Sequence, residues 1–428
     1  MKNGKVWNLP SNFPRAVIAT PESKFCSDLI TNTPMQRVIS TALHDFPDET
    51  NKPLNGDFKM FKRNVLAVSL SLGLAAFAGQ ASADVVGGGA SLSAGVFNDI
   101  ITGENYNYES YVSVGSSAGK RAFFGNDSSE FGYDPALVPT VHYAGSDSIA
   151  TSAEISNYAA NDQSTFGDLI QVPFAGTSVT VPFNNSEVTA MNPLVLSSSD
   201  VAKIFSGQIT NWNQLGAFSS KQITVVHRAD GSGTVEIFTR HLAAVEPTLF
   251  QTSTNFLTAR IGTPSGSAVF QSANGSSGVV SLMNSIDGAI TFVSPDYVDP
   301  SDPSEVAAII NPTNSTAYMP TQVNVQVTFD SVTPPSTTNP ADWAPIFPNP
   351  SAGYPIAGFT YMLLSECYND PAIGAAISNF AINHYAGLHD SYISSASLIP
   401  LPSSWQNAVL NTYALNINGS GCASVTGR

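Results

Sequence analysis

The sequence predicts an α/β fold built from two or three domain-sized units, and three observations support this prediction. Short apolar strands are followed by small-residue loops and then by helix starts, an order typical of α/β proteins. The chain has 428 residues, of which 43% are hydrophobic, enough for more than one core. Residues 169–184 form a long β-rich run, which predicts a crossing between two domains.

Three units of strand, loop and helix start follow one another in the first half. In residues 84–93 the turn lies at 87–89 and Ser91 is the helix cap. In residues 111–124 the loop lies at 115–119 and the helix begins at 120. In residues 141–148 the loop carries Ser146 and Asp147.

The second half continues the pattern. Residues 196–215 predict a helix capped by Ser198 or Ser199, and residues 222–227 predict a strand. The apolar run at 288–298 predicts a strand that returns the chain to the first domain. The remaining expectations are surface loops over 299–350 around a strand-like segment at 323–329, an apolar strand from 354, and a final amphipathic helix.

Residues 60–83 have the layout of a secretory signal. Lys62 and Arg63 precede an apolar stretch of about 14 residues, and Ala81-Ser82-Ala83 has the A-x-A form of a signal peptidase site. We therefore expect cleavage before Asp84 and a periplasmic or secreted protein, with a buried core helix as the alternative. Residues 1–59 are interpreted as a non-native upstream extension, with Met60 as the start.

The composition excludes several classes of partner. The net charge is −15, whereas nucleic-acid binding requires a basic face. No run reaches the roughly 18 apolar residues of a membrane-spanning helix. The GxxxxGK[ST] loop is absent, and GGGASL lacks the third glycine of GxGxxG, which excludes the common nucleotide-binding motifs. Abundant Ser, Thr and Asn leave an exported adhesin or structural protein as an alternative.

Two cysteines follow the predicted cleavage site. Cys26 leaves with the upstream segment, so Cys367 and Cys422 remain as an even pair in an exported chain. This favours a disulfide that anchors the C-terminal tail. Two unpaired buried thiols are the alternative.

The stretch HRADGSGTVEIFTRHL, residues 227–242, concentrates anion-binding groups. Residues 231–233 turn the chain and Thr234 begins a helix, whose N-terminus offers unpaired N–H donors and partial positive charge. Arg228 adds a forked cation that matches oxyanions. Asp230 is placed to hold that guanidinium by a salt link. An ordinary capped helix with a surface arginine is the alternative.

Together with other loops, this stretch resembles the phosphate-binding proteins of bacterial ABC transporters, and most closely their DING subgroup. GGGASL, GSSAG and GSDS resemble the family's glycine-rich opening, second serine loop and ligand aspartate, and RADGSGT matches its most specific motif without a gap. KIFSGQITNWNQL, SAGYPIAGFT, NHYAG and LIPLPSSW extend the resemblance along nearly the whole chain after residue 83. The chain departs from the subgroup at its Asp84-Val85-Val86-Gly87 start, at Ser91 in place of threonine, and by lacking a second cysteine pair.

The resemblance implies a two-lobed periplasmic binding protein fold of type II with two crossover strands as the hinge. Lobe I would comprise residues 84–171 and 294–428, and lobe II residues 172–293. The implied ligand is inorganic phosphate, with no cofactor and no metal, for a monomer whose candidate partner is an ABC transporter permease. The implied phosphate-binding residues are Ser91, Leu92, Ser116, Asp147, Arg228, Ser232, Gly233 and Thr234, with Asp230 in support.

Among these residues Asp147 is the one that selects the ligand. An ionised carboxylate only accepts hydrogen bonds, so it requires a ligand that has a proton to donate. Hydrogen phosphate has such a proton at neutral pH and sulfate does not. A buried acceptor facing sulfate would stay unpaired, which disfavours sulfate.

Enzymatic functions are the main rivals. Residues 230–233 resemble an Asp-Ser-Gly hydrolase pattern, but a nucleophilic serine needs an oriented base, and we expect His227 to point elsewhere. The DING resemblance also implies a secreted alkaline phosphatase as the alternative function. A metal-dependent route requires clustered ligands, and after the predicted cleavage site only His384 and His389 lie close together in sequence.

Overall fold

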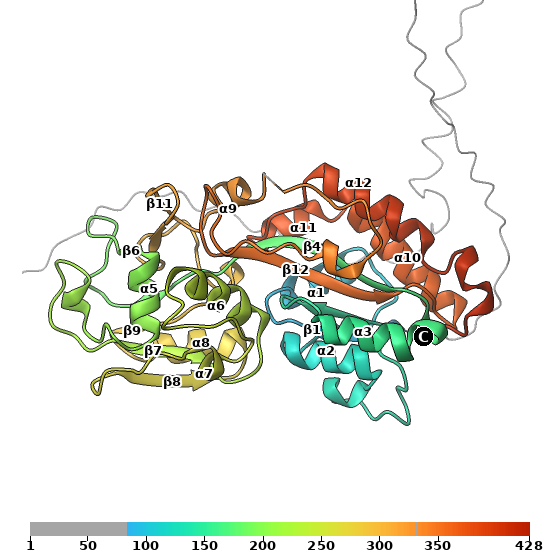
Figure 1. Cartoon of the computed structure of the whole chain (residues 1–428), viewed down its shortest axis with the longest axis horizontal. Helices are drawn as coiled ribbons and strands as arrows, with labels where there is room; N and C mark the ends of the chain where they lie inside the picture. Colours follow the sequence, from blue (N-terminus) through green and yellow to red (C-terminus); the bar gives the residue numbers. More distant parts are fainter. Residues whose placement is uncertain (1–83, 331) are drawn as a thin grey trace, which may run out of the picture. The chain divides into compact units, whose positions relative to one another are not determined.

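Figure 1 shows a computed structural model of the chain, which describes residues 84–330 and 332–428. The upstream extension, the export signal and Cys26 lie outside the described residues. Within this range the α/β prediction is confirmed, because helices alternate with strands that form three sheets. None of the helices in this range is both long and apolar enough to cross a membrane.

The first sheet brings three loops of the first half together. Its strands are β1 (Gly87–Gly89), β2 (Val112–Ser113), β3 (Tyr143–Ser146), β4 (Leu169–Ser178) and β12 (Ala357–Ser365), in the order β2-β1-β3-β12-β4. β1 is parallel to β2 and β3, whereas β12 is antiparallel to β3 and β4. Because parallel strands end at the same edge, the loops after β1, β2 and β3 converge there.

The second sheet repeats this arrangement. Its strands are β5 (Phe183–Asn184), β7 (Thr224–Arg228), β8 (Val269–Ala273) and β9 (Ala289–Ile290), in the order β5-β9-β7-β8. β7 is parallel to both β8 and β9. Helices α6 (Gly233–Val245) and α8 (Gly275–Asn284) follow β7 and β8, so their N-termini lie at the same edge. A small third sheet pairs β6 (Val195–Ser197), β10 (Ala308–Ile310) and β11 (Ala317–Tyr318).

The other helices cover these sheets and the C-terminal part of the chain. The α-helices are α1 (Ala94–Gly103), α2 (Ser116–Gly125), α3 (Ser152–Asn161), α4 (Gln163–Phe166), α5 (Ser198–Phe205), α7 (Phe256–Ala259), α9 (Gln322–Phe329), α10 (Pro371–Tyr385), α11 (Asp390–Ser395) and α12 (Ser403–Thr412). The short 3-10 helices are η2 (Ser128–Phe131), η3 (Trp212–Gln214), η4 (Pro295–Tyr297), η5 (Pro340–Trp343), η6 (Ala414–Asn416) and η7 (Ser420–Ser424).

The two segments predicted to cross between lobes run beside each other. β4 is buried along its length and pairs with β12 as far as Ser178. Figure 1 shows these two strands side by side. Just beyond it, Thr180 N–H donates to Val293 O at 2.8 Å and Val293 N–H donates to Thr180 O at 3.1 Å. These two hydrogen bonds hold the segments together, as a hinge made of two strands requires. The lobe boundaries at 171/172 and 293/294 remain a prediction.

The predicted turn at residues 87–89 is wrong, because these glycines form strand β1. Close packing explains the glycines. A Cβ at Gly87 would lie 2.1 Å from the Tyr143 ring, and one at Gly88 would lie 2.3 Å from the Val112 carbonyl oxygen. Neighbouring strands therefore fill the space that a side chain would need.

The strand-like segment at 323–329 is also a wrong prediction, because it lies in helix α9. Thr321 caps the helix by accepting the Asn324 N–H, and Val325 and Phe329, four residues apart, are both buried. Phe329 stacks on Phe359 of β12 with ring centroids 4.7 Å apart. Tertiary packing thus overrides the β propensity of the valines.

Three predicted helix starts shift by a few residues. Helix α1 begins at Ala94 after Ser93, so Ser91 is not its cap. Helix α2 begins at Ser116 rather than at residue 120. The cap of α5 is Ser197, whose hydroxyl accepts from Asp200 N–H at 3.0 Å, and not Ser198 or Ser199. The first shift leaves the Ser91 hydroxyl available for another role.

The largest apolar cluster supports the first sheet. Phe97 of α1 stacks on Phe174 of β4 with centroids 4.3 Å apart, and Phe174 stacks on His384 of α10 at 4.2 Å. Burial of these rings holds α1 and α10 against β4.

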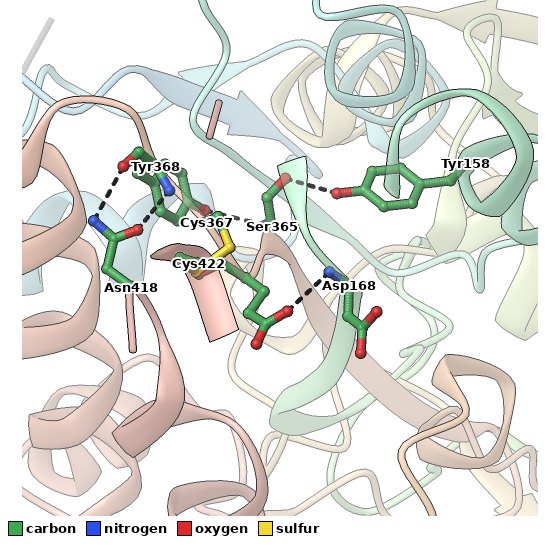
Figure 2. Close-up of a disulfide and its surroundings, with 8 residues drawn as sticks. Tyr158, Asp168, Ser365, Cys367, Tyr368, Asn418 and Cys422 are labelled. Atoms are coloured by element: carbon green, nitrogen blue, oxygen red, sulfur yellow. Dashed lines mark hydrogen bonds between the residues drawn. A yellow bond between two sulfur atoms is a disulfide. The ribbon is translucent and has the colours of Figure 1, made fainter. Parts of the chain in front are cut away.

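The disulfide predicted between Cys367 and Cys422 is present. Figure 2 shows it beside Asn418, whose side chain bonds the backbone of Tyr368 at both N–H and C=O, at 2.5 and 3.1 Å. On the strand before it, Ser365 accepts the Tyr158 hydroxyl at 3.0 Å. The cross-link thus anchors the C-terminal segment to the end of β12.

We expect loss of this disulfide to destabilise the protein. The bond closes a sequence separation of 55 residues, so removing it restores conformational entropy to the unfolded chain. A Cys367→Ala/Cys422→Ala variant should lose about 2–4 kcal/mol in the free energy of unfolding, measured by urea denaturation. Wild type with its disulfide reduced serves as the matched comparison, and coincident curves for oxidised and reduced protein would contradict the prediction.

Candidate functional site

The predicted site residues lie at the ends of the parallel strands of both sheets. All eight are buried: Ser91, Leu92, Ser116, Asp147, Arg228, Ser232, Gly233 and Thr234. Hydrogen bonds join them across the two sheets. Ser91, which follows β1, accepts from Arg228 at the end of β7, and Ser116, which follows β2, accepts from Gly233 at the start of α6.

The salt link predicted between Arg228 and Asp230 is present. Arg228 Nε donates to Asp230 Oδ1 at 2.7 Å, and Nη2 donates to Oδ2. The Arg228 side chain is only 2% exposed, so the pairing with Asp230 offsets the desolvation cost of burying its charge. Burial alone would raise the pKa of Asp230, but the Arg228 guanidinium and the backbone N–H groups of Gly275 and Asp230 together lower that pKa. The pair therefore holds a fixed cation in the site, with Nη1 facing Ser91 at 3.1 Å.

Ser116 joins the first sheet to helix α6. Its Oγ accepts two backbone N–H groups, from Asp147 and Gly233, both at 3.1 Å, and donates to Asp147 Oδ2 at 3.3 Å. The helix start approaches so closely that a Cβ at Gly233 would lie 2.4 Å from the backbone of Asp147 and Ser148. Glycine at 233 is thus required by contact with the opposite loop.

Asp147 is a buried carboxylate, and one of its two oxygens has no hydrogen-bond partner among the described residues. Its Oδ1 is buried and makes no hydrogen bond of normal geometry with other described residues. Burial raises the pKa of Asp147 to about 6, opposed by the Thr360 hydroxyl, the Arg228 guanidinium and the Ser116 hydroxyl. At neutral pH the group is largely ionised, so Oδ1 is an acceptor that needs a donor.

The three remaining members contribute in different ways. The Leu92 side chain packs in the largest apolar cluster. Only the backbone of Leu92 is therefore available to a ligand. The Ser232 N–H donates to Thr254 O at 2.9 Å, so the hydroxyl is the group of Ser232 that can serve a ligand. Thr234 Oγ1 is buried and forms no hydrogen bond with other described residues. Thr234 thus offers a hydroxyl donor beside the N-terminus of α6.

Sequence reasoning missed residues that the fold adds to the site. Ser276, in the first turn of α8, lies with its Oγ 3.1 Å from Ser91 Oγ and 3.4 Å from Arg228 Nη1. The stretch VFQSANGSSG has the same order of strand, small-residue loop and helix that identified the other loops, so this signal was available. Thr360, inside β12, offered no such signal. Its buried hydroxyl lies close enough to lower the pKa of Asp147.

His227 lies near Ser232 in sequence but has other partners in the structure. His227 Nδ1 hydrogen-bonds the carbonyl oxygen of Arg228 at 3.0 Å, and its ring stacks on Phe256 with centroids 4.6 Å apart. These contacts engage one ring nitrogen and one ring face of His227 with groups other than Ser232. Within the described ranges, no cluster of three or more His, Cys, Asp or Glu side chains could hold a metal ion.

A family model described as the PBP superfamily domain matches residues 76–381. This chain belongs to the PBP superfamily. Alkaline phosphatase L of Pseudomonas aeruginosa is 38% identical over 366 residues, which cover 83% of this chain and 94% of that protein. A phosphate-binding protein from an unknown prokaryotic organism is 35% identical over 384 residues, covering 81% of this chain and 100% of that protein.

A solved structure places the chain more narrowly within the superfamily. The high-affinity periplasmic phosphate-binding protein PfluDING, solved with bound phosphate at pH 8.5, is 34% identical with a TM-score of 0.72. The match covers 81% of this chain and 99% of PfluDING. The predicted DING subgroup and type II periplasmic binding protein fold are thereby confirmed.

The raised pKa of Asp147 gives this DING-type chain a distinctive pH dependence. A carboxyl whose folded pKa lies above its unfolded value takes up protons on folding, so its ionisation costs stability as pH rises from about 4 to 6. Asp147→Asn should therefore be more stable than wild type above pH 6 without ligand, by about 3 kcal/mol at most, with the gap closing toward pH 4.

Urea unfolding of ligand-free protein between pH 4 and 8 measures this difference. Asp99→Asn, which removes an exposed carboxylate of α1, is the matched control. Parallel pH profiles for wild type and Asp147→Asn would show that burial does not raise this pKa.

Proposed function

We propose that this chain is an exported phosphate-binding protein that holds hydrogen phosphate at the site formed by the two sheets. The observation that carries the proposal is the pairing of many donors with one unsatisfied acceptor. Arg228, backbone N–H groups and hydroxyls such as Thr234 supply donors, while Asp147 Oδ1 is a buried acceptor. The sequence-similar PfluDING structure, which contains phosphate, supports the same conclusion.

Hydrogen phosphate matches this set of groups. Its oxygens accept from the guanidinium, the hydroxyls and the helix N-terminus, and its one proton can be donated to Asp147 Oδ1. Sulfate has no proton at neutral pH, so it would leave Asp147 unpaired beside a second anion. An unsatisfied buried charge costs more than an unsatisfied neutral group, on the order of several kcal/mol, and this disfavours sulfate.

We further propose that binding involves closure of two lobes, residues 84–171 with 294–428 and residues 172–293. Ser91 and Ser116 follow strands of the first sheet, whereas Arg228 ends β7 of the second sheet and Gly233 begins the helix after it. The hydrogen bonds between these two groups therefore form only when the sheets approach. The paired segments at Thr180 and Val293 provide the hinge. An ABC transporter permease is the proposed recipient of the phosphate.

The chain is an exported protein, and we propose that residues 60–83 are the signal that exports it. Expression from Met60 in a Gram-negative host should yield a periplasmic or secreted product that begins at Asp84, as read by N-terminal sequencing. A product retained in the cytoplasm with residues 60–83 attached would contradict the signal assignment.

The central test is calorimetric titration of the purified exported protein with phosphate and sulfate at pH 7.5. Wild type, stripped of ligand by reversible denaturation, should bind phosphate tightly and sulfate undetectably. Asp147→Asn should bind phosphate more weakly and gain sulfate binding, because an amide can donate to an unprotonated oxyanion. The Asp99→Asn control should match wild type. Folded, ligand-free wild type that ignores phosphate would overturn the proposal.

A secreted phosphomonoesterase is the second candidate, favoured by the 38% identity to Alkaline phosphatase L. The phosphate-binding proposal predicts that p-nitrophenyl phosphate hydrolysis at alkaline pH is no faster with wild type than with an Arg228→Ala variant, which loses the site's cation. Hydrolysis that disappears in Arg228→Ala and is inhibited by free phosphate would instead support the phosphomonoesterase.

A further inference from the structure

The first turn of α8 contacts the site at two points. Ser276 is 1% exposed, and its Oγ lies within hydrogen-bonding distance of Ser91 Oγ and Arg228 Nη1. The neighbouring Gly275 N–H donates to Asp230 Oδ1 at 3.0 Å. Two consecutive residues of α8 therefore bond both members of the Arg228–Asp230 pair.

We propose that Ser276 is a further phosphate ligand, donating its hydroxyl proton to the bound anion from the N-terminus of α8. This inference rests on the proposed phosphate-binding function and adds a residue outside the set implied by the family resemblance. It makes α8 a third helix start at the site, beside those of α2 and α6.

Two donor protons in the cluster formed by Arg228, Asp230, Ser91 and Ser276 have no acceptor within that cluster. An arginine side chain has five N–H donors. In Arg228, Nε and one Nη2 hydrogen serve Asp230, and the two Nη1 hydrogens serve Ser91 and Ser276. Each serine oxygen thus accepts from the guanidinium, and the serine-to-serine bond of 3.1 Å uses only one of the two hydroxyl protons. One hydroxyl proton and one Nη2 hydrogen remain for an oxyanion.

The same contacts link α8 to closure. Ser91 follows a strand of the first sheet and Ser276 follows a strand of the second, 185 residues apart in sequence. Through Gly275 and Asp230, α8 also orients the guanidinium. An anion that accepts the remaining hydroxyl proton from Ser276 and the remaining Nη2 hydrogen of Arg228 is held by the cluster that joins the two sheets. Loss of Ser276 should therefore speed phosphate release more than it slows capture.

The test compares Ser276→Ala with Ser277→Ala. Both remove one hydroxyl from the same helix turn, but Ser277 is exposed. We expect Ser276→Ala to weaken phosphate binding by roughly tenfold to a hundredfold, the range for a hydrogen bond to a charged partner, mainly through a faster off-rate in stopped flow. Ser277→Ala should bind as wild type does, and Ser276→Thr, which restores a hydroxyl, should recover part of the affinity. Urea unfolding without ligand establishes that each variant is folded.

A Ser91→Ala background shows whether Ser276 donates to phosphate directly or only orients Ser91. If Ser276 donates to phosphate itself, adding Ser276→Ala to Ser91→Ala weakens binding further. If Ser276 acts only by orienting Ser91, the second substitution has no effect and the proposal is overturned. Wild-type affinity in Ser276→Ala, with wild type binding phosphate, also overturns it. A wild-type protein that fails to bind phosphate would instead remove the proposed function on which the inference rests.

Discussion

The buried ion pair between Arg228 and Asp230 is the interaction on which the rest of the site depends. A guanidinium that is 2% exposed carries a large desolvation cost, and the two-point contact with Asp230 offsets it. Asp230 also accepts from Gly275, so the pair is fixed to the start of α8. Once Arg228 is held on one side, its remaining N–H groups face Ser91 of the other sheet. The cation is thus oriented before a ligand arrives.

An acidic protein can bind an anion in this way because the attraction is local. The chain has a net charge of −15, yet the site gathers one guanidinium, helix N-termini and hydroxyls in a buried space. Fixed dipoles act strongly where water is excluded, whereas surface charges act through solvent. In the proposed function Asp147 supplies selectivity, because a buried acceptor disfavours a ligand that has no proton to donate.

The two sheets share one arrangement, in which helix starts lie at the edge where the parallel strands end. Parallel strands end at one edge, and a helix that starts there turns its N–H groups toward that edge. In the first sheet this places Ser116 at the start of α2, and in the second it places Gly233 at the start of α6. Glycine at 233 permits the close approach, since a side chain would overlap the backbone of the Asp147 loop.

Much of this could be predicted from the sequence because it depends on local order. The run from Arg228 to Thr234 combines a strand end, a glycine turn and a helix start, and the spacing from Arg228 to Asp230 is short enough to predict their ion pair. The valines of residues 323–329, however, favour a strand, and only packing of Phe329 against β12 decides for a helix.

The sequence by itself therefore determined the local motifs: the strand–loop–helix units, the Arg228–Asp230 pair and the two cysteines. The tertiary structure alone decided which distant residues meet them. Ser276 reaches Ser91 across 185 residues, and Thr360 reaches Asp147 because β12 lies between β3 and β4. The physical reason is that strand order and register, which depend on burial over the whole chain, set these distances, and no local pattern encodes them.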